Sequence, residues 1–123
     1  MSKRNIVHVE IPAANVEAAG KFYQELFGWK LQHMAEMNYT MWEDATGAGG
    51  GFPQVSDESP AGQVLVYIDS DDIEADLKKA EKLGGKVIHP KAEIPGTGWF
   101  GMFQDPTGNV IGLYTSMSPD FNK

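Results

Sequence analysis

The sequence predicts an α+β fold in which a βαβββ module occurs twice, the two modules forming a cup-shaped mixed sheet. The first observation is a repeat, because residues 100–113 resemble residues 39–52 at a constant offset. The aligned pairs are Met41 with Met102, Trp42 with Phe103, Asp44 with Asp105, Thr46 with Thr107, Gly47 with Gly108 and Gly51 with Gly112. The second observation is that each repeat follows a strand pattern and then an amphipathic helix pattern, in the same order.

Each repeat has the pattern of a β-hairpin, in which an apolar and aromatic run precedes an Asp-x-Thr-Gly turn and a second run. The aspartate can bond the backbone two residues on, and glycine tolerates the left-handed last position of the turn. In the second copy, Pro106 also presets φ. We therefore predict one hairpin at residues 39–52 and another at residues 100–113.

The length and composition are those of one soluble globular domain. The chain has 123 residues, of which 41% are hydrophobic and 22% are charged. Because a module of half this length would be marginally stable alone, the two copies should pack together or against those of a second chain. We expect one domain over residues 1–123, with module one at about 5–55, a junction at 56–62, module two at about 63–116 and a loose tail at 117–123.

Charge and cysteine content exclude several classes of protein. The formal net charge of −7 argues against a nucleic-acid-binding surface, which needs clustered Lys and Arg. The absence of cysteine excludes disulfides, thiolate nucleophiles and cysteine-based metal sites. No run approaches the roughly 18 apolar residues of a membrane span, and residues 1–10 lack the apolar core of a signal peptide. We expect a cytoplasmic protein without nucleic-acid or membrane partners.

The spacing of apolar and polar residues predicts the elements of the first module. Its expected elements are a strand at residues 6–11, a helix between an N-cap at Asn15 and a stop at Gly28, and a strand at residues 29–36. The apolar positions of that helix are Val16, Ala19, Phe22, Tyr23, Leu26 and Phe27. Alternation in the first strand places His8 and Glu10 on a mostly polar face, opposite the apolar face of Val9 and Ile11.

The second module repeats this order. We expect a strand at residues 63–68, a helix with a capping box of Asp71 and Glu74, a strand at residues 86–92 and a turn-rich loop at residues 94–98. The buried stripe of the helix is expected at Ile73, Leu77, Ala80 and Leu83. Strand parity puts Gln63 and Tyr67 on the face that corresponds to that of His8. The two polar faces would line a curved cleft when the modules join.

Three motifs carry a family resemblance. They are His-x-Glu-Ile-Pro at residues 8–12, Phe-Tyr-x-x-Leu-Phe-Gly-Trp at residues 22–29 and Asp-Pro-Thr-Gly-Asn at residues 105–109. With the repeated module, the chain resembles the vicinal oxygen chelate superfamily over about residues 5–116. That superfamily includes glyoxalase I, extradiol dioxygenases, and fosfomycin and bleomycin resistance proteins, and the resemblance implies the glyoxalase/bleomycin resistance/dihydroxybiphenyl dioxygenase fold.

The resemblance also implies positions for a divalent metal ion, held by His, Gln or Glu from the first and last strands of each module. Carried over, these positions fall on His8, Gln63, Gly51 and Gly112. Two of them are glycines, which have no ligand atoms in a side chain, whereas a divalent ion normally needs three or four protein ligands. We therefore expect no cofactor. The alternative is a Zn, Ni, Mn or Fe ion bound by His8 and Gln63 with nonstandard ligands.

Six residues are candidates for the site. His8 and Glu10 lie on one strand face and would serve as a catalytic acid and base, since imidazole titrates near neutral pH. A histidine held by hydrogen bonds in a cavity wall and solvated strand polarity are the competing interpretations. The expected ligand-binding residues are Gln63, Tyr67 and Tyr114 on cleft-facing strands and Trp99 in a glycine-flanked loop.

Two further features have structural explanations. The run Gly47-Ala-Gly-Gly-Gly51 lacks the Lys and Ser/Thr of a phosphate-binding loop. Gly49 to Gly51 are expected to leave room for a close-packed backbone or for a ligand. The aromatic residues Tyr39, Trp42, Phe100 and Phe103 are expected to supply core.

Three functions remain open. The first is a small-molecule-binding protein of the glyoxalase and bleomycin-resistance type, with a ligand in the cleft between modules and no standard metal site. The second is an enzyme, namely a metal-dependent glyoxalase-like lyase, an isomerase or a dioxygenase that uses His8. The third is a partner-binding scaffold. The resemblance also implies a homodimer.

Overall fold

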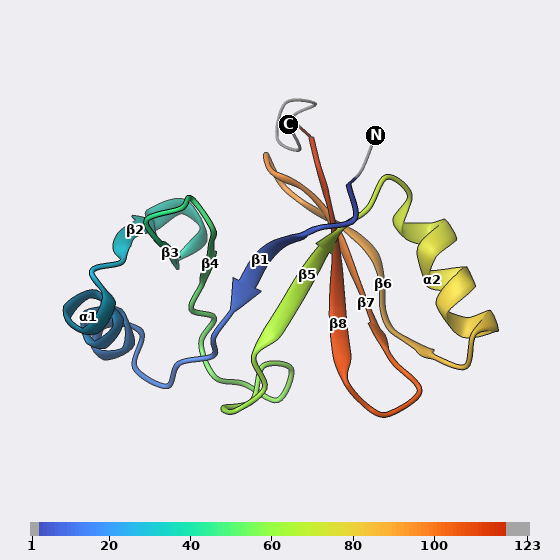
Figure 1. The fold of residues 1–123 in the computed structure, drawn as a ribbon, viewed down its shortest axis with the longest axis horizontal. Helices are drawn as coiled ribbons and strands as arrows, with labels where there is room; N and C mark the ends of the chain where they lie inside the picture. Colours follow the sequence, from blue (N-terminus) through green and yellow to red (C-terminus); the bar gives the residue numbers. More distant parts are fainter. Residues whose placement is uncertain (1–2, 118–123) are drawn as a thin grey trace. The chain divides into compact units, whose positions relative to one another are not determined.

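A computed structural model describes residues 3–117, so the predicted loose tail lies outside the described residues except for Met117. The chain divides into two compact units (Figure 1). The first unit is His8–Leu65, and the second contains the chain from Val66 onward together with the segment that ends at Val7. In both units, the described residues follow the order βαβββ, and the α+β class is confirmed.

The first unit contains a mixed four-stranded arrangement and one α-helix. Its elements are β1 (Ile6–Glu10), α1 (Val16–Phe27), β2 (Lys30–Met34), the 3₁₀ turn η1 (Ala35–Met37), β3 (Tyr39–Glu43) and β4 (Gly49–Gly51). The strand order is β2-β3-β4-β1. Strand β1 runs parallel to β4, with Val9 opposite Gly50 and Glu10 opposite Gly51, whereas the other pairs are antiparallel.

Helix α1 begins and ends at the residues that the sequence indicates. The side chain of Asn15 accepts a hydrogen bond of 2.9 Å from the backbone N–H of Ala18, which satisfies one free donor of the first turn. Gly28 ends the helix with φ +76°, a left-handed conformation that glycine adopts without strain.

The core of the first unit lies between α1 and the strands. Trp42 and Phe52 are buried there, and Trp29 stacks on Trp42 with ring centroids 4.0 Å apart. The helix stripe is only partly covered, since Phe22, Leu26 and Phe27 are exposed. The face of α1 that packs against β2 and β3 is therefore narrower than its apolar stripe.

The second unit has the same layout. Its elements are β5 (Leu65–Asp69), α2 (Ile73–Lys82), β6 (Lys86–Ile94), β7 (Gly98–Gln104) and β8 (Val110–Ser116). The strand order is β5-β8-β7-β6, with β5 and β8 parallel and the other pairs antiparallel. Ile73, Leu77 and Leu113 form the buried core between α2 and the strands.

Two expectations about α2 are wrong. The N-cap is Asp72 rather than Asp71, because the helix begins at the buried Ile73 and the carboxylate of Asp72 accepts a bond of 3.0 Å from the N–H of Ala75. Leu83 is 70% exposed instead of buried, because the helix ends at Lys82 before the stripe is complete.

The repeated turns are confirmed in detail. Oδ1 of Asp44 accepts hydrogen bonds from the N–H and hydroxyl of Thr46, and Oδ1 of Asp105 does the same for Thr107. The pKa of both aspartates lies below its ordinary value, chiefly because of the bond from the Thr46 hydroxyl at Asp44 and the bond from the backbone N–H of Asn109 at Asp105, since these bonds favour the ionised carboxylates. Gly47 and Gly108 close the turns with φ of +93° and +100°.

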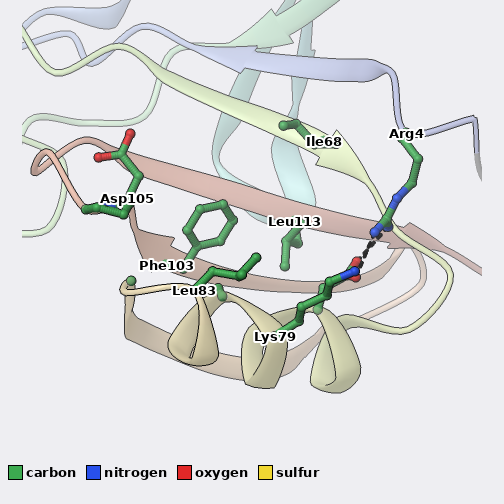
Figure 2. Close-up of a pocket in the computed structure, with 11 residues that line it drawn as sticks. Arg4, Ile68, Lys79, Leu83, Phe103, Asp105 and Leu113 are labelled. Atoms are coloured by element: carbon green, nitrogen blue, oxygen red, sulfur yellow. Dashed lines mark hydrogen bonds and ion pairs between the residues drawn. The ribbon is translucent and has the colours of Figure 1, made fainter.

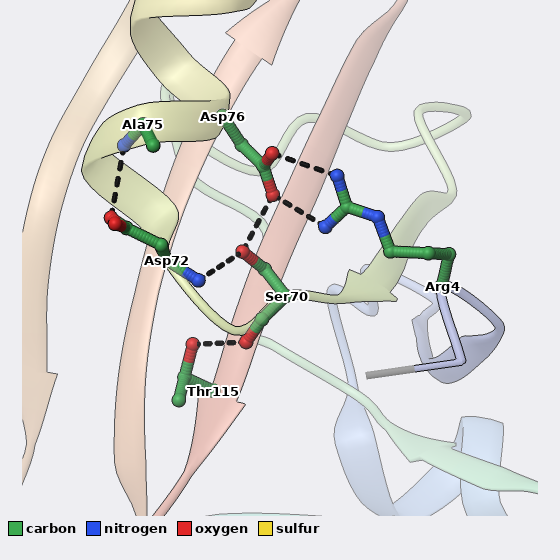
Figure 3. A network of polar contacts seen from close by, with 6 residues as sticks. All are labelled: Arg4, Ser70, Asp72, Ala75, Asp76 and Thr115. Carbon is green, nitrogen blue, oxygen red and sulfur yellow. Dashed lines mark hydrogen bonds and ion pairs between the residues drawn. The ribbon is translucent and has the colours of Figure 1, made fainter. Parts of the chain in front are cut away.

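A polar network fixes the segment before β1 to α2 within the second unit (Figure 3). The guanidinium of Arg4 donates two hydrogen bonds, of 2.6 and 2.7 Å, to the carboxylate of Asp76. The hydroxyl of Ser70 donates a third bond of 2.6 Å to the same carboxylate. These donors, chiefly Arg4, hold the pKa of Asp76 below its ordinary value of 3.8.

This network predicts a pH-dependent contribution to stability. Because the pKa of Asp76 is lower in the folded state, the stabilisation is present above the unfolded value of 3.8 and is lost as pH falls through the folded value. Asp76→Asn should lower the free energy of unfolding by about 1–2 kcal/mol at pH 7 and by less at about pH 2.5, measured by urea denaturation. The control is Asp57→Asn, an exposed aspartate of the junction. An equal loss at both pH values would contradict the network.

Candidate functional site

The candidate site is a network of His8, Tyr39 and Glu10 in the first unit. The hydroxyl of Tyr39 donates a hydrogen bond of 2.7 Å to Oε2 of Glu10. Nε2 of His8 lies 2.9 Å from the same hydroxyl oxygen and 3.7 Å from Oε2 of Glu10. The His8 and Glu10 side chains are 22% and 16% exposed, so the network is sheltered but open to solvent on one side.

The hydrogen-bond geometry defines the protons of the network. An ionised carboxylate only accepts, and the phenol has one proton, which goes to Glu10. The phenol oxygen must then accept from His8, so Nε2 of His8 carries a proton. The phenol oxygen thus connects imidazole and carboxylate through two hydrogen bonds, along which a proton can move.

Glycine at position 51 makes room for Tyr39. Strand β1 presents His8 and Glu10 on one face, and β4 runs beside it with Gly51 opposite Glu10. A Cβ at position 51 would collide with the phenol of Tyr39, which therefore occupies the space of the missing side chain. Of the two uses expected for the glycine run, backbone packing is confirmed at Gly50, whose Cβ would overlap the backbone of Val9. Gly51 admits the ring of Tyr39.

Tyr39 was expected in the core, and this expectation is wrong. It shares strand β3 with the buried Trp42, but an odd number of positions separates them, so they lie on opposite faces. The period of two was thus a signal against a core position for Tyr39. Its partners on the neighbouring strands were not deducible from that signal.

In the second unit, a glycine likewise leaves space for a tyrosine ring, but the tyrosine comes from a different strand. Tyr67 lies opposite Gly112 across β5 and β8, as Glu10 lies opposite Gly51. A Cβ at Gly112 would meet the Tyr67 ring at 2.5 Å, so this glycine also leaves space for a tyrosine. Tyr67 is 7% exposed, and it corresponds by register to Glu10.

The expected match of Gln63 with His8 is wrong. The register that pairs Tyr67 with Glu10 makes Leu65 the counterpart of His8. Gln63 precedes β5, is exposed, and donates its backbone N–H to the carbonyl of Pro60 at 3.2 Å. The position of β5 that corresponds to His8 of β1 therefore holds an apolar side chain, that of Leu65.

Trp99 and Tyr114 lie apart from the network along the chain, both in the second unit. Trp99 was expected in a loop, but it belongs to β7 and packs against the core of Ile73 and Leu77. Tyr114 in β8 donates its hydroxyl to the carbonyl of Thr97 at 3.1 Å, and burial raises the pKa of its phenol. A role of either residue in ligand binding stays a prediction.

The residues present do not fit the divalent ion that the family resemblance implies. Gly51 and Gly112 lack ligand atoms, and tyrosine rings fill the space above them. In β5, the position that corresponds to His8 holds Leu65, which has no oxygen or nitrogen donor in its side chain. Among residues 3–117, no group of three or more His, Cys, Asp or Glu side chains is arranged to hold a metal. His8 and Glu10 alone are fewer than the three or four ligands of an ordinary site.

We expect Tyr39→Phe to open the network without unfolding the protein, because the ring stays above Gly51 while both hydrogen bonds of the hydroxyl are lost. The free energy of unfolding should fall by about 1–2 kcal/mol in urea denaturation. Tyr23→Phe is the matched control, since Tyr23 stacks in the aromatic cluster of the same unit. If the two variants were equally stable, the Tyr39 hydroxyl would not bridge His8 and Glu10.

The comparisons with known proteins agree with this fold. The model of the Glyoxalase/Bleomycin resistance protein/Dioxygenase superfamily matches residues 5–113. The chain therefore belongs to this superfamily. A "Glyoxylase-like domain-containing protein" of Didymella fabae is 33% identical over 115 residues, covering 87% of this chain and 90% of the relative.

A second relative is longer than this chain. CFP32 of Mycobacterium bovis, named as a candidate glyoxylase, is 30% identical over 117 residues, which cover 86% of this chain but 43% of the relative. The chain thus spans less than half of that protein.

Solved structures of low sequence identity share the fold alone. A superfamily member from Vibrio splendidus 12B01 has a TM-score of 0.68 and 13% identity, covering 91% of this chain and all of its own. Methylmalonyl-CoA epimerase from Mycobacterium tuberculosis has a TM-score of 0.70 and 15% identity, covering 92% of this chain and 88% of its own. Within residues 3–117, no helix has the length and apolarity needed to cross a membrane.

Proposed function

We propose that this protein binds a small molecule at the His8–Tyr39–Glu10 network and does so without the standard divalent metal of its superfamily. The observation that carries the proposal is the Tyr39 phenol, which bonds both His8 and Glu10 and fills the space above Gly51. A ligand that binds to this partly exposed network would contact polar groups whose orientations are already fixed by hydrogen bonds. Such pre-organisation favours binding, because less side-chain freedom is lost.

The network also has the composition of an acid–base group. A ligand with a titratable or polarised hydrogen would exchange protons with His8, while Glu10 and Tyr39 hold the imidazole in one orientation. Binding without turnover remains the simpler function.

The test is a two-dimensional ¹H–¹⁵N NMR titration with bleomycin and with a library of small neutral and anionic fragments. We expect a compound that shifts the amide signals of His8, Glu10 and Tyr39. Its affinity should be about tenfold lower in Tyr39→Phe, which corresponds to one lost hydrogen bond. The proposal fails if none of these compounds moves those signals, or if Tyr39→Phe and His8→Ala bind the compound as tightly as the parent protein.

A metal-dependent lyase, isomerase or dioxygenase is the second candidate. It is favoured by the closeness of His8 and Glu10, whose nearest nitrogen and oxygen atoms lie 3.7 Å apart, and by the relatives named as glyoxylases. It would require ligands beyond these two residues. Titration with Zn²⁺ and Ni²⁺ is decisive here, because an enzyme of this kind should saturate at one ion per chain with changes centred on His8 and Glu10.

A further inference from the structure

The second unit contains a pocket that shares no residue with the His8–Tyr39–Glu10 network. Its volume is about 480 Å³, within the range of small-molecule sites. It lies on the side of the strands that faces α2 (Figure 2). The residues that line it include Arg4, Ile68, Lys79, Leu83, Phe103 and Leu113.

The position of α2 explains the pocket. The helix packs mainly against β6 and β7 and to a smaller extent against β8. The surface near the half-buried Ile68 of β5 is therefore left partly uncovered by the helix, and the buried Leu113 of β8 also lines the pocket. Leu83, just beyond the end of α2, is 70% exposed although it lines the pocket. An apolar ligand would remove this leucine side chain from water, which favours binding.

The charged side chains of the pocket differ in the hydrogen bonds and ion pairs that they already make within the protein. Asp76 accepts hydrogen bonds from Arg4 and Ser70, and Asp105 accepts bonds from its own turn. In the part of the chain that the structure describes, the ammonium of Lys79 makes no hydrogen bond or ion pair, although its charge acts on Asp76 and lowers the pKa of that carboxyl. Lys79 therefore offers hydrogen-bond donors to a ligand in this pocket.

Figure 2 shows how the polar and apolar parts are arranged. Arg4 and Lys79 lie at one end of the pocket and Asp105 at the other, with Phe103 and Leu113 between them. A ligand with its anionic group at Lys79 would extend its apolar part over these side chains. The carboxylate of Asp76, which also lines the pocket, is paired with Arg4, whereas the opposite orientation would bring the anion to Asp105, which repels it.

We propose that this pocket binds a small apolar carboxylate. The hydrocarbon part covers Ile68, Leu83 and Phe103, and the carboxylate accepts a hydrogen bond from the ammonium of Lys79. The proposal is independent of the function proposed for the His8 network, because the two sets of residues do not overlap.

Calorimetric titration with decanoate tests this proposal, with decanol as the uncharged probe of similar shape. Decanoate should bind the parent protein saturably, and Lys79→Ala should weaken it about tenfold without changing the affinity for decanol. Leu83→Gln should weaken both probes, and it should fold because Leu83 is exposed.

Matched variants separate this site from general effects. Lys78→Ala removes a neighbouring exposed cation of α2 that does not line the pocket, and Leu26→Gln replaces an exposed leucine of the first unit. Both variants, and His8→Ala, should bind decanoate like the parent. The proposal is overturned if the parent shows no saturable binding, if Lys79→Ala and Lys78→Ala weaken it equally, or if only His8→Ala abolishes it.

Discussion

Gly50→Ala is expected to destabilise the first unit by about 3 kcal/mol, a large part of the stability of a small domain. A Cβ at this position would overlap the carbonyl oxygen of Val9 and lie 2.6 Å from its carbonyl carbon. Val9 is the partner of Gly50 in the parallel pair of β1 and β4, so relief requires the two strands to separate. Chemical denaturation followed by tryptophan fluorescence measures the loss, because Trp29 and Trp42 lie in this unit.

Gly20→Ala is the control for this substitution. Gly20 is buried in α1, and a Cβ there meets only the flexible tip of Leu31, at 3.0 Å. Alanine is a better helix former than glycine by about 1 kcal/mol, which offsets this close contact. If Gly50→Ala proved as stable as Gly20→Ala, β1 and β4 would not approach each other as described.

Gly51→Ala should have its largest effect on the site. The added methyl group takes the place of the Tyr39 phenol, which must swing away and lose its bonds to His8 and Glu10. We expect a destabilisation of about 2 kcal/mol and the loss of small-molecule binding at the network. Long-range ¹H–¹⁵N NMR of His8 gives a direct readout, because the ring loses the phenol acceptor that favours a proton on Nε2.

A double-variant cycle distinguishes this collision from a backbone effect. In a Tyr39→Ala background the ring is absent, so Gly51→Ala should cost less than about 0.5 kcal/mol. Gly50→Ala should stay as costly in that background, because it meets backbone atoms of Val9. Equal costs of Gly51→Ala with and without Tyr39 would show that the phenol does not occupy this space.

Local signals predicted much of the fold. The turns at Asp44 and Asp105 and the cap at Asn15 depend on bonds to residues close by in the chain, so short motifs specify them. The alternation that placed His8 and Glu10 together is equally local. These features needed no knowledge of which strands pair.

The errors arose where strand pairing or helix position decides the outcome. Tyr39 is recognisable as a site residue only once β4, with Gly51, is known to lie beside both β1 and β3. Gln63 was matched to His8 by counting along the chain, but the pairing of β5 with β8 shifts the register to Leu65. Leu83 is exposed because α2 ends at Lys82. Its side chain lines the pocket together with Lys79.

In the proposed function, the network and the two covered glycines form a site that uses hydrogen bonds in place of an ion. In this arrangement, the Tyr39 phenol holds His8 and Glu10 together, so truncating any one of the three should disturb the other two. Buried polar networks behave in this coupled way when each member depends on its neighbours. The arrangement also explains why positions 51 and 112 need glycine although they carry no ligand.

Elemental analysis of protein purified without chelators tests this account most directly. We expect Zn, Ni, Mn and Fe well below one ion per chain, and the same content in the parent protein and in His8→Ala. One ion per chain in the parent that is absent from His8→Ala would contradict the account, because His8 would then serve as a metal ligand.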